Sequence, residues 1–433
     1  MSSFYESWSK DQLIARIQQL EVANNLAGPP QSVSIPAIQT PNSKDTNEVI
    51  EATVTKKKKS FDYSKFSTRR IAIRFAYLGW NYNGLAVQIN TDVPTVEGHI
   101  LAALHKTKLI PSIDPNDCEF SRCGRTDKGV SALRQVISLR VRSLLTPEQQ
   151  TDSANDNKEI DYLHILNQLL PDDIRLYEIC LQPPEGFDAR FSCLYRHYKY
   201  FFHNNNKLNL SKMLAAAKSF EGVHDFRNFC KVDGSKQISN FKREILSASI
   251  VKVSQCDDDN SLYCFDLKGT AFLWHQVRSM VAILFLVGQE LEAPEVIQTL
   301  LDVENTPRRP AYEMAADIPL VLYDCGFPEM PWKSFKNEDS LQRLQDRLYF
   351  MWHSTWMKLT MASVMREMIQ NSAHPSYGAP SNHESHRIVV NLGDGKGKNL
   401  TKYVLLSKRE TLEPPEVVNE RWLRRKADKN KTE

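Results

Sequence analysis

The 433-residue sequence contains only eight cysteines, and their spacing matches neither a zinc site nor a disulfide framework. No two cysteines have C-x-x-C spacing, and no matching pair of histidines follows the neighbouring Cys118 and Cys123. Cysteines this sparse are typical of reduced thiols in a protein core.

Long apolar runs and a secretory leader are also missing. The longest apolar run, residues 280–287, is far shorter than the ~20 residues of a bilayer-spanning helix. The N-terminus has no basic segment that leads into an apolar one, as a signal peptide would have. We expect a soluble protein that is made and kept inside the cell, without a membrane partner.

Neither sign of charge dominates, because 55 basic residues are balanced by 52 acidic ones. The basic residues gather at 56–59, 122–142 and 421–431. Such runs are usually solvated surface. The middle run begins in a glycine-containing loop and ends in a predicted strand, so it can instead form one wall of a basic cleft.

The hydrophobic share of 41% and the charged share of 25% are ordinary for a globular protein and exclude a collagen or a wholly disordered chain. Residues 1–65 are predicted to hold a short helix at 7–23 and a disordered linker from 25 to about 60. The four lysines at 56–59 fit a nuclear localisation signal, an RNA tether or a solubility device equally well.

The periodicity of residues 66–187 predicts a first α+β half. Strands are expected at 70–77, 135–142 and 174–181, with helices from Thr95 and after Asp161. Residues 188–330 predict a second α+β half, with strands at 198–203, 245–253 and 262–267, a helix at 210–220 and a buried helix at 272–291.

Residues 331–433 form a predicted C-terminal extension. Apolar side chains stripe a long helix at 338–369, and a hairpin is expected at 388–406, turned by the glycines of 393–397.

One carboxylate, Asp127, lies between Arg125 and Lys128 in a loop that contains Gly124 and Gly129. Neighbouring cations favour the ionised acid, so we expect an anion that can act as nucleophile or base. A turn with a surface ion pair is the ordinary alternative.

Two further segments hold polar residues in apolar surroundings. Arg278 lies in the predicted buried helix and therefore needs an anion nearby, while His275 is more typical of a satisfied core histidine. The alternating aromatics of 198–202, close to basic residues, fit either base stacking or a core strand.

Together these segments resemble the TruA family of tRNA pseudouridine synthases over residues 69–325, especially its eukaryotic branch that acts on tRNA positions 38 and 39. The residues that carry the resemblance are 124–130, 77–84, 170–174, 189–192, Tyr198 and Arg278, in that family's order.

The resemblance implies a role for each of five residues. Asp127 would be the nucleophile, and Arg125 would take the place of the flipped nucleotide in the RNA stem. Tyr198 would pack on the target base, Leu320 would lie under it, and Arg278 would form an ion pair with Asp127.

Two positions depart from the bacterial pattern. Pro319 stands where bacterial members have glycine, which weakens the match at Leu320, and Ser131 stands where they have histidine. Ser131 and residues 77–80 indicate the branch that acts on positions 38 and 39.

The resemblance also implies the fold: two α+β halves that share an extended antiparallel sheet around a central basic cleft, with N- and C-terminal extensions. The implied partners are tRNA and a second copy of the chain, with no cofactor and no metal. The implied reaction isomerises uridine to pseudouridine, and a location in nucleus and cytoplasm is expected.

Two alternatives stay open. A noncatalytic tRNA-binding or chaperone protein could use the same scaffold, although binding alone would gain from losing the acid at Asp127. A phosphate-handling loop at 393–397 is disfavoured, because it lacks the Gly-Lys-Ser/Thr ending and a following helix.

Overall fold

The computed structural model describes residues 61–88, 93–204, 208–253, 261–372 and 388–432. They belong to one compact unit that begins at Phe61. The helix predicted at 7–23 and the linker predicted at 25–60 lie outside the described residues. None of the helices in the described ranges combines the length and the apolar composition that crossing a membrane requires.

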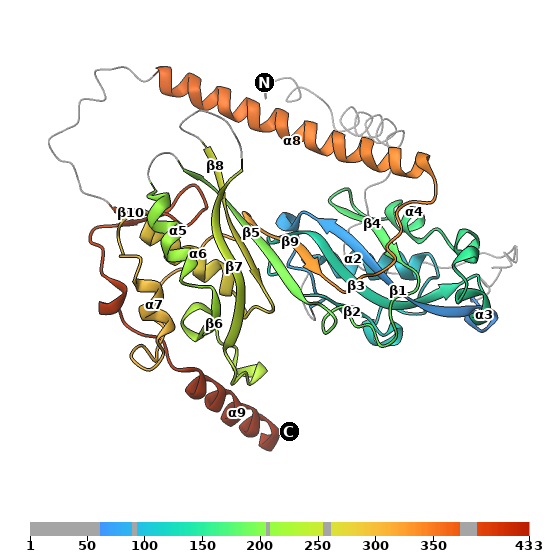
Figure 1. Ribbon diagram of the computed structural model, residues 1–433, viewed down its shortest axis with the longest axis horizontal. Coiled ribbons are helices and arrows are strands. Elements are labelled where there is room, and N and C mark those ends of the chain that lie inside the picture. The colour runs from blue at the N-terminus through green and yellow to red at the C-terminus, as the bar shows by residue number, and fades with distance from the viewer. Residues whose placement is uncertain (1–60, 89–92, 205–207, 254–260, 373–387, 433) are drawn as a thin grey trace, which may run out of the picture. The chain divides into compact units, whose positions relative to one another are not determined.

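One large sheet runs through the unit, in the strand order β4-β1-β3-β9-β5-β8-β7-β6, with β2 paired to β3 (Figure 1). Its strands are β1 (Ser67–Tyr77), β2 (Ser121–Arg122), β3 (Ser131–Ser143), β4 (Ile174–Cys180), β5 (Tyr195–Asn204), β6 (Gly222–Asp225), β7 (Lys242–Lys252), β8 (Ser261–Gly269) and β9 (Leu320–Gly326). The mixed α+β class and the extended, mostly antiparallel sheet predicted from the sequence are confirmed.

The sheet becomes continuous through β9, which lies between β3 and β5. β9 runs antiparallel to β5, but it pairs in parallel with β3, where Ser131 is opposite Val321 and Ala132 is opposite Leu322. The sheet is therefore antiparallel except at this one junction. The parallel contact is short, so the two sides of the sheet are joined by few main-chain hydrogen bonds.

Helices cover the sheet at positions that the sequence signals. They are α2 (Val96–Lys106), α3 (Pro147–Gln150), α4 (Tyr162–Asn167), α5 (Leu210–Lys218), α6 (Gln276–Gly288), α7 (Val296–Leu301), α8 (Glu338–Ser372) and α9 (Pro415–Thr432). Thr95, Asp161 and Asn209 cap α2, α4 and α5, each by accepting a hydrogen bond from the main-chain nitrogen three residues later. The small hairpin of β10 (Ile388–Val390) and β11 (Lys398–Leu400) confirms the hairpin predicted at 388–406.

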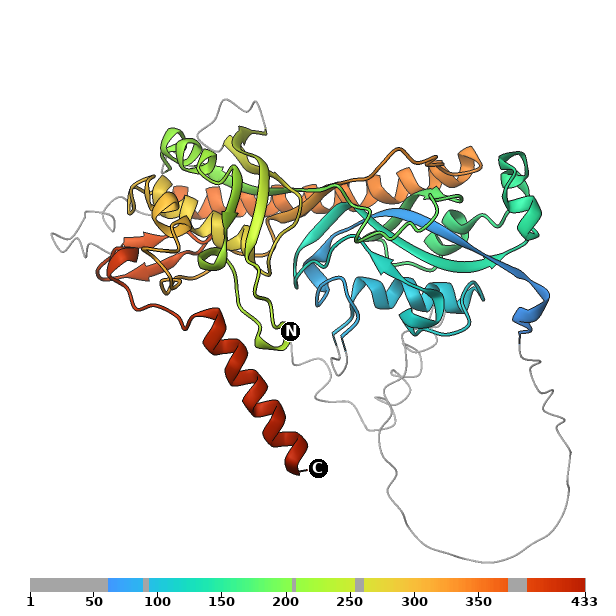
Figure 2. The ribbon, with the colours of Figure 1, turned by 60° about the horizontal axis from the view of Figure 1, so that its bottom comes forward.

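The buried helix predicted at 272–291 is α6, which begins only at Gln276. Twelve of its thirteen residues are buried, and it packs beside α5 against the second side of the sheet (Figure 2). The start is later than predicted because His275 has φ 61°, in the left-handed region that an α-helix cannot contain. The turn before α6 is therefore an independent element.

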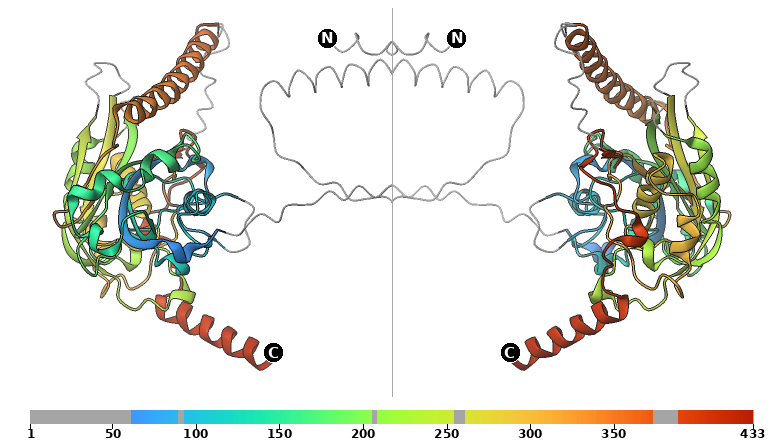
Figure 3. Two further views of the ribbon diagram at one scale, coloured as in Figure 1. Left: turned by 90° about the vertical axis from the view of Figure 1, so that its right-hand side faces the viewer. Right: turned by 90° about the vertical axis from the view of Figure 1, so that its left-hand side faces the viewer.

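The long helix predicted at 338–369 is α8, but its apolar stripe is not part of the core. Among its 35 residues only Ser340 and Leu344 are buried, and the helix stands out from the rest of the unit (Figure 3). Large side chains including Phe350, Trp352 and Met361 are exposed. Helical periodicity thus predicted α8 but did not indicate whether its apolar face is covered.

Candidate active site

The segment 124–130 connects β2 to β3 and carries Asp127. Tyr77 Oη and Thr126 Oγ1 lie 2.7 Å apart and share a hydrogen bond, and Gln135 Nε2 donates to the carbonyl oxygen of Gly124 over 2.9 Å. The main-chain nitrogen of Leu85 donates to the carbonyl oxygen of Thr126. Buried side chains of β1 and β3 therefore fix the ends of this catalytic-loop candidate.

Close main-chain approaches explain the glycines around the loop. A Cβ atom on Gly79 would lie 2.0 Å from the carbonyl oxygen of Val130, and one on Gly84 would lie 2.7 Å from that of Thr126. Gly129 has φ +80°, and a Cβ there would lie 2.7 Å from Cγ of Asp317. The turn that follows β1 thus packs directly on the loop, with no room for side chains between them.

Asp127 contacts the turn before α6. Trp274 Nε1 donates a hydrogen bond of 3.1 Å to Oδ1 of Asp127. Nε2 of His275 lies 3.5 Å from Oδ2, and the Asp127 side chain is 29% exposed against 10% for that of His275. The acid is therefore held by two aromatic rings and still reaches solvent.

The ion pair expected between Asp127 and Arg278 is not present in the described structure. Arg278 lies in the first turn of α6, and its Nε donates over 2.8 Å to the carbonyl oxygen of Ala315. Its charge still acts on Asp127, since it is the largest of the charges that lower the pKa of this acid. Arg278 is therefore near the Asp127 carboxylate but does not form an ion pair with it.

The pKa of Asp127 is raised from its ordinary value, although its cationic neighbours in the chain favour the ionised acid. Burial of the carboxyl is the largest cause, and Asp317 adds to it. The positive charge of Arg278 and the hydrogen bond from Trp274 act in the opposite direction without cancelling the effect. The neighbours of Asp127 in the chain give no measure of its burial, so the direction of this shift could not be predicted from them.

His275 is not the satisfied core histidine that the sequence favours. Burial first, and then the charge of Arg278, lowers the pKa of His275 to about 4, so the ring is neutral at neutral pH. Its Nδ1 is buried without a hydrogen-bond partner among the described residues. A strained main chain at φ 61° holds this ring beside Asp127, as is common at functional sites.

Tyr198 and Leu320 are both buried in the middle of the sheet. Tyr198 lies in β5 opposite Leu322 of β9, and its ring meets Phe272 edge-on at 5.0 Å. Burial raises the pKa of Tyr198, and the nearby Cys123 and Tyr77 side chains raise it further. Leu320 begins β9, directly after the turn that contains Asp317. Both residues border the region of the catalytic-loop candidate.

The basic run at 122–142 does not form a wall of free cations. Three of its arginines are paired with acids from other segments: Arg122 with Glu97, Arg134 with Asp324 and Arg140 with Glu119. Within the part of the chain that the structure describes, Arg125 and Lys128 have no ion pair, and both are exposed beside Asp127. Within the described part of this run, the exposed cations without an ion pair are those of the loop itself.

The three alternating aromatic residues of β5, Tyr198, Tyr200 and Phe202, are buried. The exposed aromatic residue of this region is Phe191, which is 80% exposed and has the guanidinium of Arg190 5.2 Å from its ring centre. An exposed aromatic ring is thus available in the turn before β5.

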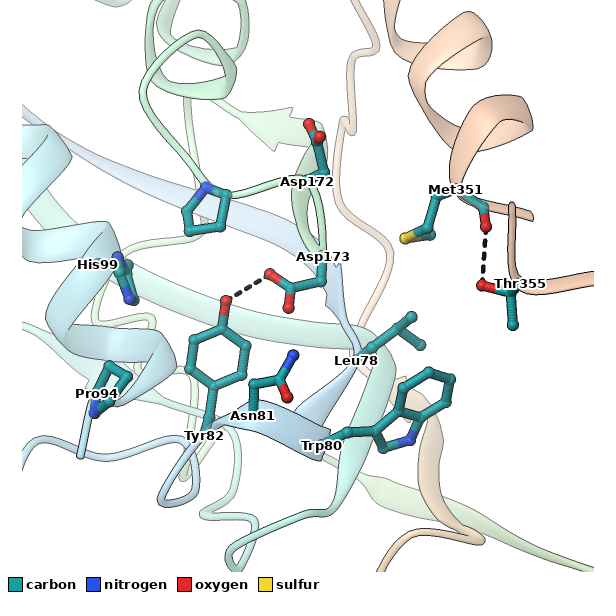
Figure 4. A pocket seen from close by; sticks show the side chains of 11 residues that line it. Leu78, Trp80, Asn81, Tyr82, Pro94, His99, Asp172, Asp173, Met351 and Thr355 are labelled. Atoms are coloured by element: carbon teal, nitrogen blue, oxygen red, sulfur yellow. Dashed lines mark hydrogen bonds between the residues drawn. The ribbon is translucent and has the colours of Figure 1, made fainter. Parts of the chain in front are cut away.

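A separate pocket of about 440 Å³ lies between the turn after β1 and the middle of α8 (Figure 4). Trp80, Asp173 and Met351 line it from three segments, and Tyr82 donates to Asp173 within it. None of its lining residues comes from the catalytic-loop candidate. No group of three or more potential metal ligands occurs among the described His, Cys, Asp and Glu residues.

Comparison with known proteins adds independent information. A family model described as tRNA pseudouridine synthase matches residues 216–328. The chain is 52% identical over 432 residues to the tRNA pseudouridine(38/39) synthase of Saccharomyces cerevisiae, covering 99% of this chain and 94% of the yeast protein.

More distant relatives match over shorter stretches. The human tRNA pseudouridine(38/39) synthase is 44% identical over 308 residues, which cover 68% of this chain and 63% of the human one. The tRNA pseudouridine synthase A of Methanothermobacter thermautotrophicus is 33% identical and matches 60% of this chain and 82% of its own length. A solved Cbf5-Nop10-Gar1 complex aligns with 12% identity and a TM-score of 0.23 over 50% of this chain and 45% of that one.

Proposed function

This chain belongs to the tRNA pseudouridine synthase family, and from that premise we propose that it isomerises uridines 38 and 39 of tRNA with Asp127 as the catalytic residue. The observation that supports Asp127 as the catalytic residue is the environment of its side chain. Asp127 is a carboxylate in a fixed loop, largely buried, hydrogen-bonded by Trp274 and still open to solvent. The name of the yeast relative supports the choice of positions 38 and 39.

The proposed reaction needs no external reagent. The bond between N1 of uracil and C1′ of ribose breaks, the base turns, and C5 bonds to C1′ while a proton leaves C5 and N1 gains one. Nothing is oxidised overall and no water is added. Asp127 supplies the carboxylate that attacks the base or the ribose, or that removes the proton.

The neighbours of Asp127 are suited to control this carboxylate. Trp274 fixes Oδ1, so that Oδ2 is the oxygen left to react. His275 is neutral and adds no charge, while Arg278 favours the ionised acid from a distance. This arrangement gives an oriented carboxylate that is poorly solvated and therefore more reactive than an exposed one.

The target uridine must leave the RNA stack before it reaches Asp127, which costs a few kcal/mol. Arg125 is exposed and unpaired among the described residues, so it is free to occupy the vacated space. Tyr198 and Leu320, buried close to the loop, are proposed to contact the extruded base. These roles follow the resemblance.

The test of this function is Asp127→Asn, assayed for pseudouridine in tRNA under single-turnover conditions. We expect loss of product formation with tRNA affinity within about tenfold of wild type, because the substitution removes the nucleophile and spares the basic surface. Asp317→Asn is the matched control, since it neutralises the nearby acid that Gly129 contacts. An active Asp127→Asn protein would sink the assignment, and an inactive wild type would favour a noncatalytic tRNA-binding protein.

We further propose that the protein is a homodimer and that α8 contributes to the interface. From Tyr349 to the end of α8 the only charged residues are Lys358, Arg366 and Glu367. A helix this apolar is normally covered. Light scattering should give a dimer mass, and the double substitution Trp352→Glu with Trp356→Glu should shift it to a monomer. Val223→Glu, at an exposed valine of β6, is the control.

The proposal for location is nucleus and cytoplasm, and it depends on the lysines at 56–59, which lie outside the described residues. A fluorescent fusion should enter the nucleus in wild-type form. Replacing the four lysines by glutamine should reduce that signal, and an unchanged distribution would contradict this role.

A further inference from the structure

The positive charge of this protein is concentrated in α9. Residues 421–431 contain six basic residues and one acidic residue, whereas the whole chain has a formal net charge of only +3. Outside residues 421–431 the chain has 49 basic residues against 51 acidic ones, so its charge there is nearly balanced. A protein that binds tRNA needs cations for the phosphates, and most arginines of the run at 122–142 that were expected to supply them are paired with acids or main-chain carbonyls.

The first half of α9 is docked on the segment that contains η6 (Gly234–Lys236). A Cβ atom on Gly234 would lie 2.8 Å from both Cβ of Trp422 and the carbonyl oxygen of Val418. Asn419 Nδ2 donates over 3.0 Å to the carbonyl oxygen of Ile238, and Gln237 Nε2 donates over 3.1 Å to that of Asn419. This interface fixes where the helix begins.

The second half of α9 leaves the surface. From Leu423 to Asn430 every residue is exposed, and Figures 1 and 2 show the helix projecting away from the sheet. Arg424 pairs only within the helix, with Glu420. An exposed helix with little apolar surface and several cations offers contacts to a polyanion and almost none to an apolar partner.

The docked end of α9 is connected to the active-site candidate. The ammonium of Lys231 lies 4.6 Å from the centre of the Trp274 ring, and the same ring donates to Asp127. The main-chain nitrogen of Lys231 also donates to the carbonyl oxygen of Trp274. Lys231 is only three residues from Gly234, on which Trp422 packs. The helix therefore starts from the wall of the site that holds the catalytic carboxylate.

We propose that α9 is an RNA-binding arm whose exposed cations contact phosphates of the tRNA outside the nucleotide that reacts. This inference rests on the proposed function for the identity of the RNA. Its physical basis is the release of counterions when cations approach phosphates. An arm of this kind raises affinity for the tRNA and leaves the chemistry at Asp127 unchanged.

The experiment is a quadruple variant of the full-length protein, Arg424→Gln, Arg425→Gln, Lys426→Gln and Lys429→Gln, with glutamine chosen because it keeps helix propensity. The control variant removes four positive charges elsewhere, by Lys106→Gln, Lys108→Gln, Lys212→Gln and Lys218→Gln, all at exposed positions. Affinity for in vitro transcribed tRNA is measured by fluorescence anisotropy over a series of salt concentrations, and product formation is measured separately at saturating protein.

The α9 variant should lose at least about tenfold in affinity, and the slope of log affinity against log salt should become shallower by up to about three. The control should show a clearly smaller change, and the saturated single-turnover rate of the α9 variant should match wild type. Equal affinity and equal slope in the α9 variant and the control would overturn the proposal. That result would point to an acidic protein as the ligand of α9.

Trp422→Ala separates charge from position. It keeps all the cations but removes the indole group beside Gly234, so we expect an intermediate loss of affinity. Wild-type affinity in Trp422→Ala would overturn the docked geometry of the arm. Because affinity is measured without turnover, a failure of the proposed reaction would be seen in the product assay alone and would not be mistaken for a failure of the arm.

Discussion

Trp274 donates its indole hydrogen to Asp127 across 147 positions of the chain. The donor lies between β8 and α6, and the acceptor lies between β2 and β3, on the other side of β9. The proposed catalytic acid is therefore oriented by one part of the sheet while its loop is built by another.

Trp274→Phe should change the pH dependence of the reaction. The substitution removes a hydrogen bond that lowers the pKa of Asp127, so the already raised pKa should rise further. Activity that requires the carboxylate is lost as pH falls through this pKa. The acidic limb of the single-turnover rate should thus move to higher pH than in wild type. An unmoved limb in Trp274→Phe would contradict the role of the indole.

Two substitutions at Arg278 separate its charge from its hydrogen bond. Arg278→Met removes both, and we expect a loss of about tenfold or more in single-turnover rate together with an acidic limb at higher pH. Arg278→Lys keeps the charge but loses the Nε–H that donates to the carbonyl oxygen of Ala315. The limb of Arg278→Lys should stay close to wild type. If both variants shift it equally, the arginine acts by packing and not by its charge.

His275 should make the fold sensitive to acid. Its pKa is about 4 in the folded protein against 6.5 for the free side chain, so the unfolded chain binds the extra proton first as pH falls. Stability is therefore complete above about pH 6.5 and declines towards pH 4. His275→Gln should reduce this decline, measured as the difference in Tm between the two pH values. An identical decline in the variant would assign the acid sensitivity to other groups.

Gly129→Ala should damage the loop by contact with one identified side chain. The residue has φ +80°, and the new methyl group would lie 2.7 Å from Cγ of Asp317. We expect a loss of about 1–3 kcal/mol in stability and a lower rate. Adding Asp317→Ala removes the clash but not the positive φ, so the double variant should recover part of the stability. No recovery would show that the main-chain conformation alone sets the cost.

Cys123 and Cys193 should form a disulfide under oxidation. Their Sγ atoms lie 3.2 Å apart, and Cys123 directly precedes the catalytic-loop candidate. A peroxide would take two electrons and two protons from the thiols and yield the disulfide and water. Mass spectrometry should find the linked peptides, with activity reduced and then restored by a thiol reductant. Cys193→Ser should be insensitive, and Cys264→Ser, at a buried cysteine of β8, is the control.

Much of the fold could be predicted from local pattern. The alternation in β1 and the cap at Thr95 each specify an element through neighbours in the chain. The exposed stripe of α8 could not be predicted, because periodicity reports which side chains share a face and not whether anything covers that face.

Asp127 could be proposed as the acid of the candidate site from the sequence, whereas the side chains around it could not. Residues 124–130 identify Asp127, whose pKa nevertheless depends on burial that no neighbour in the chain reveals. Trp274 and His275 approach it from a turn with positive φ, for which the sequence offers no glycine as a signal. The acids that pair with Arg122 and Arg134 are also distant in the chain. The sequence therefore predicts a basic wall at 122–142, whereas in the structure most of its arginines are paired.

The position of β9 has a consequence for folding during translation. It fills the middle of the sheet, yet it is the last strand of that sheet to be translated. Until residues 320–326 emerge, β3 and β5 each present an open edge, and open edges invite pairing with other chains. A chain that ended between Gly269, the last residue of β8, and Leu320 would therefore contain two half-sheets with unpaired edges and would lack the strand that joins them.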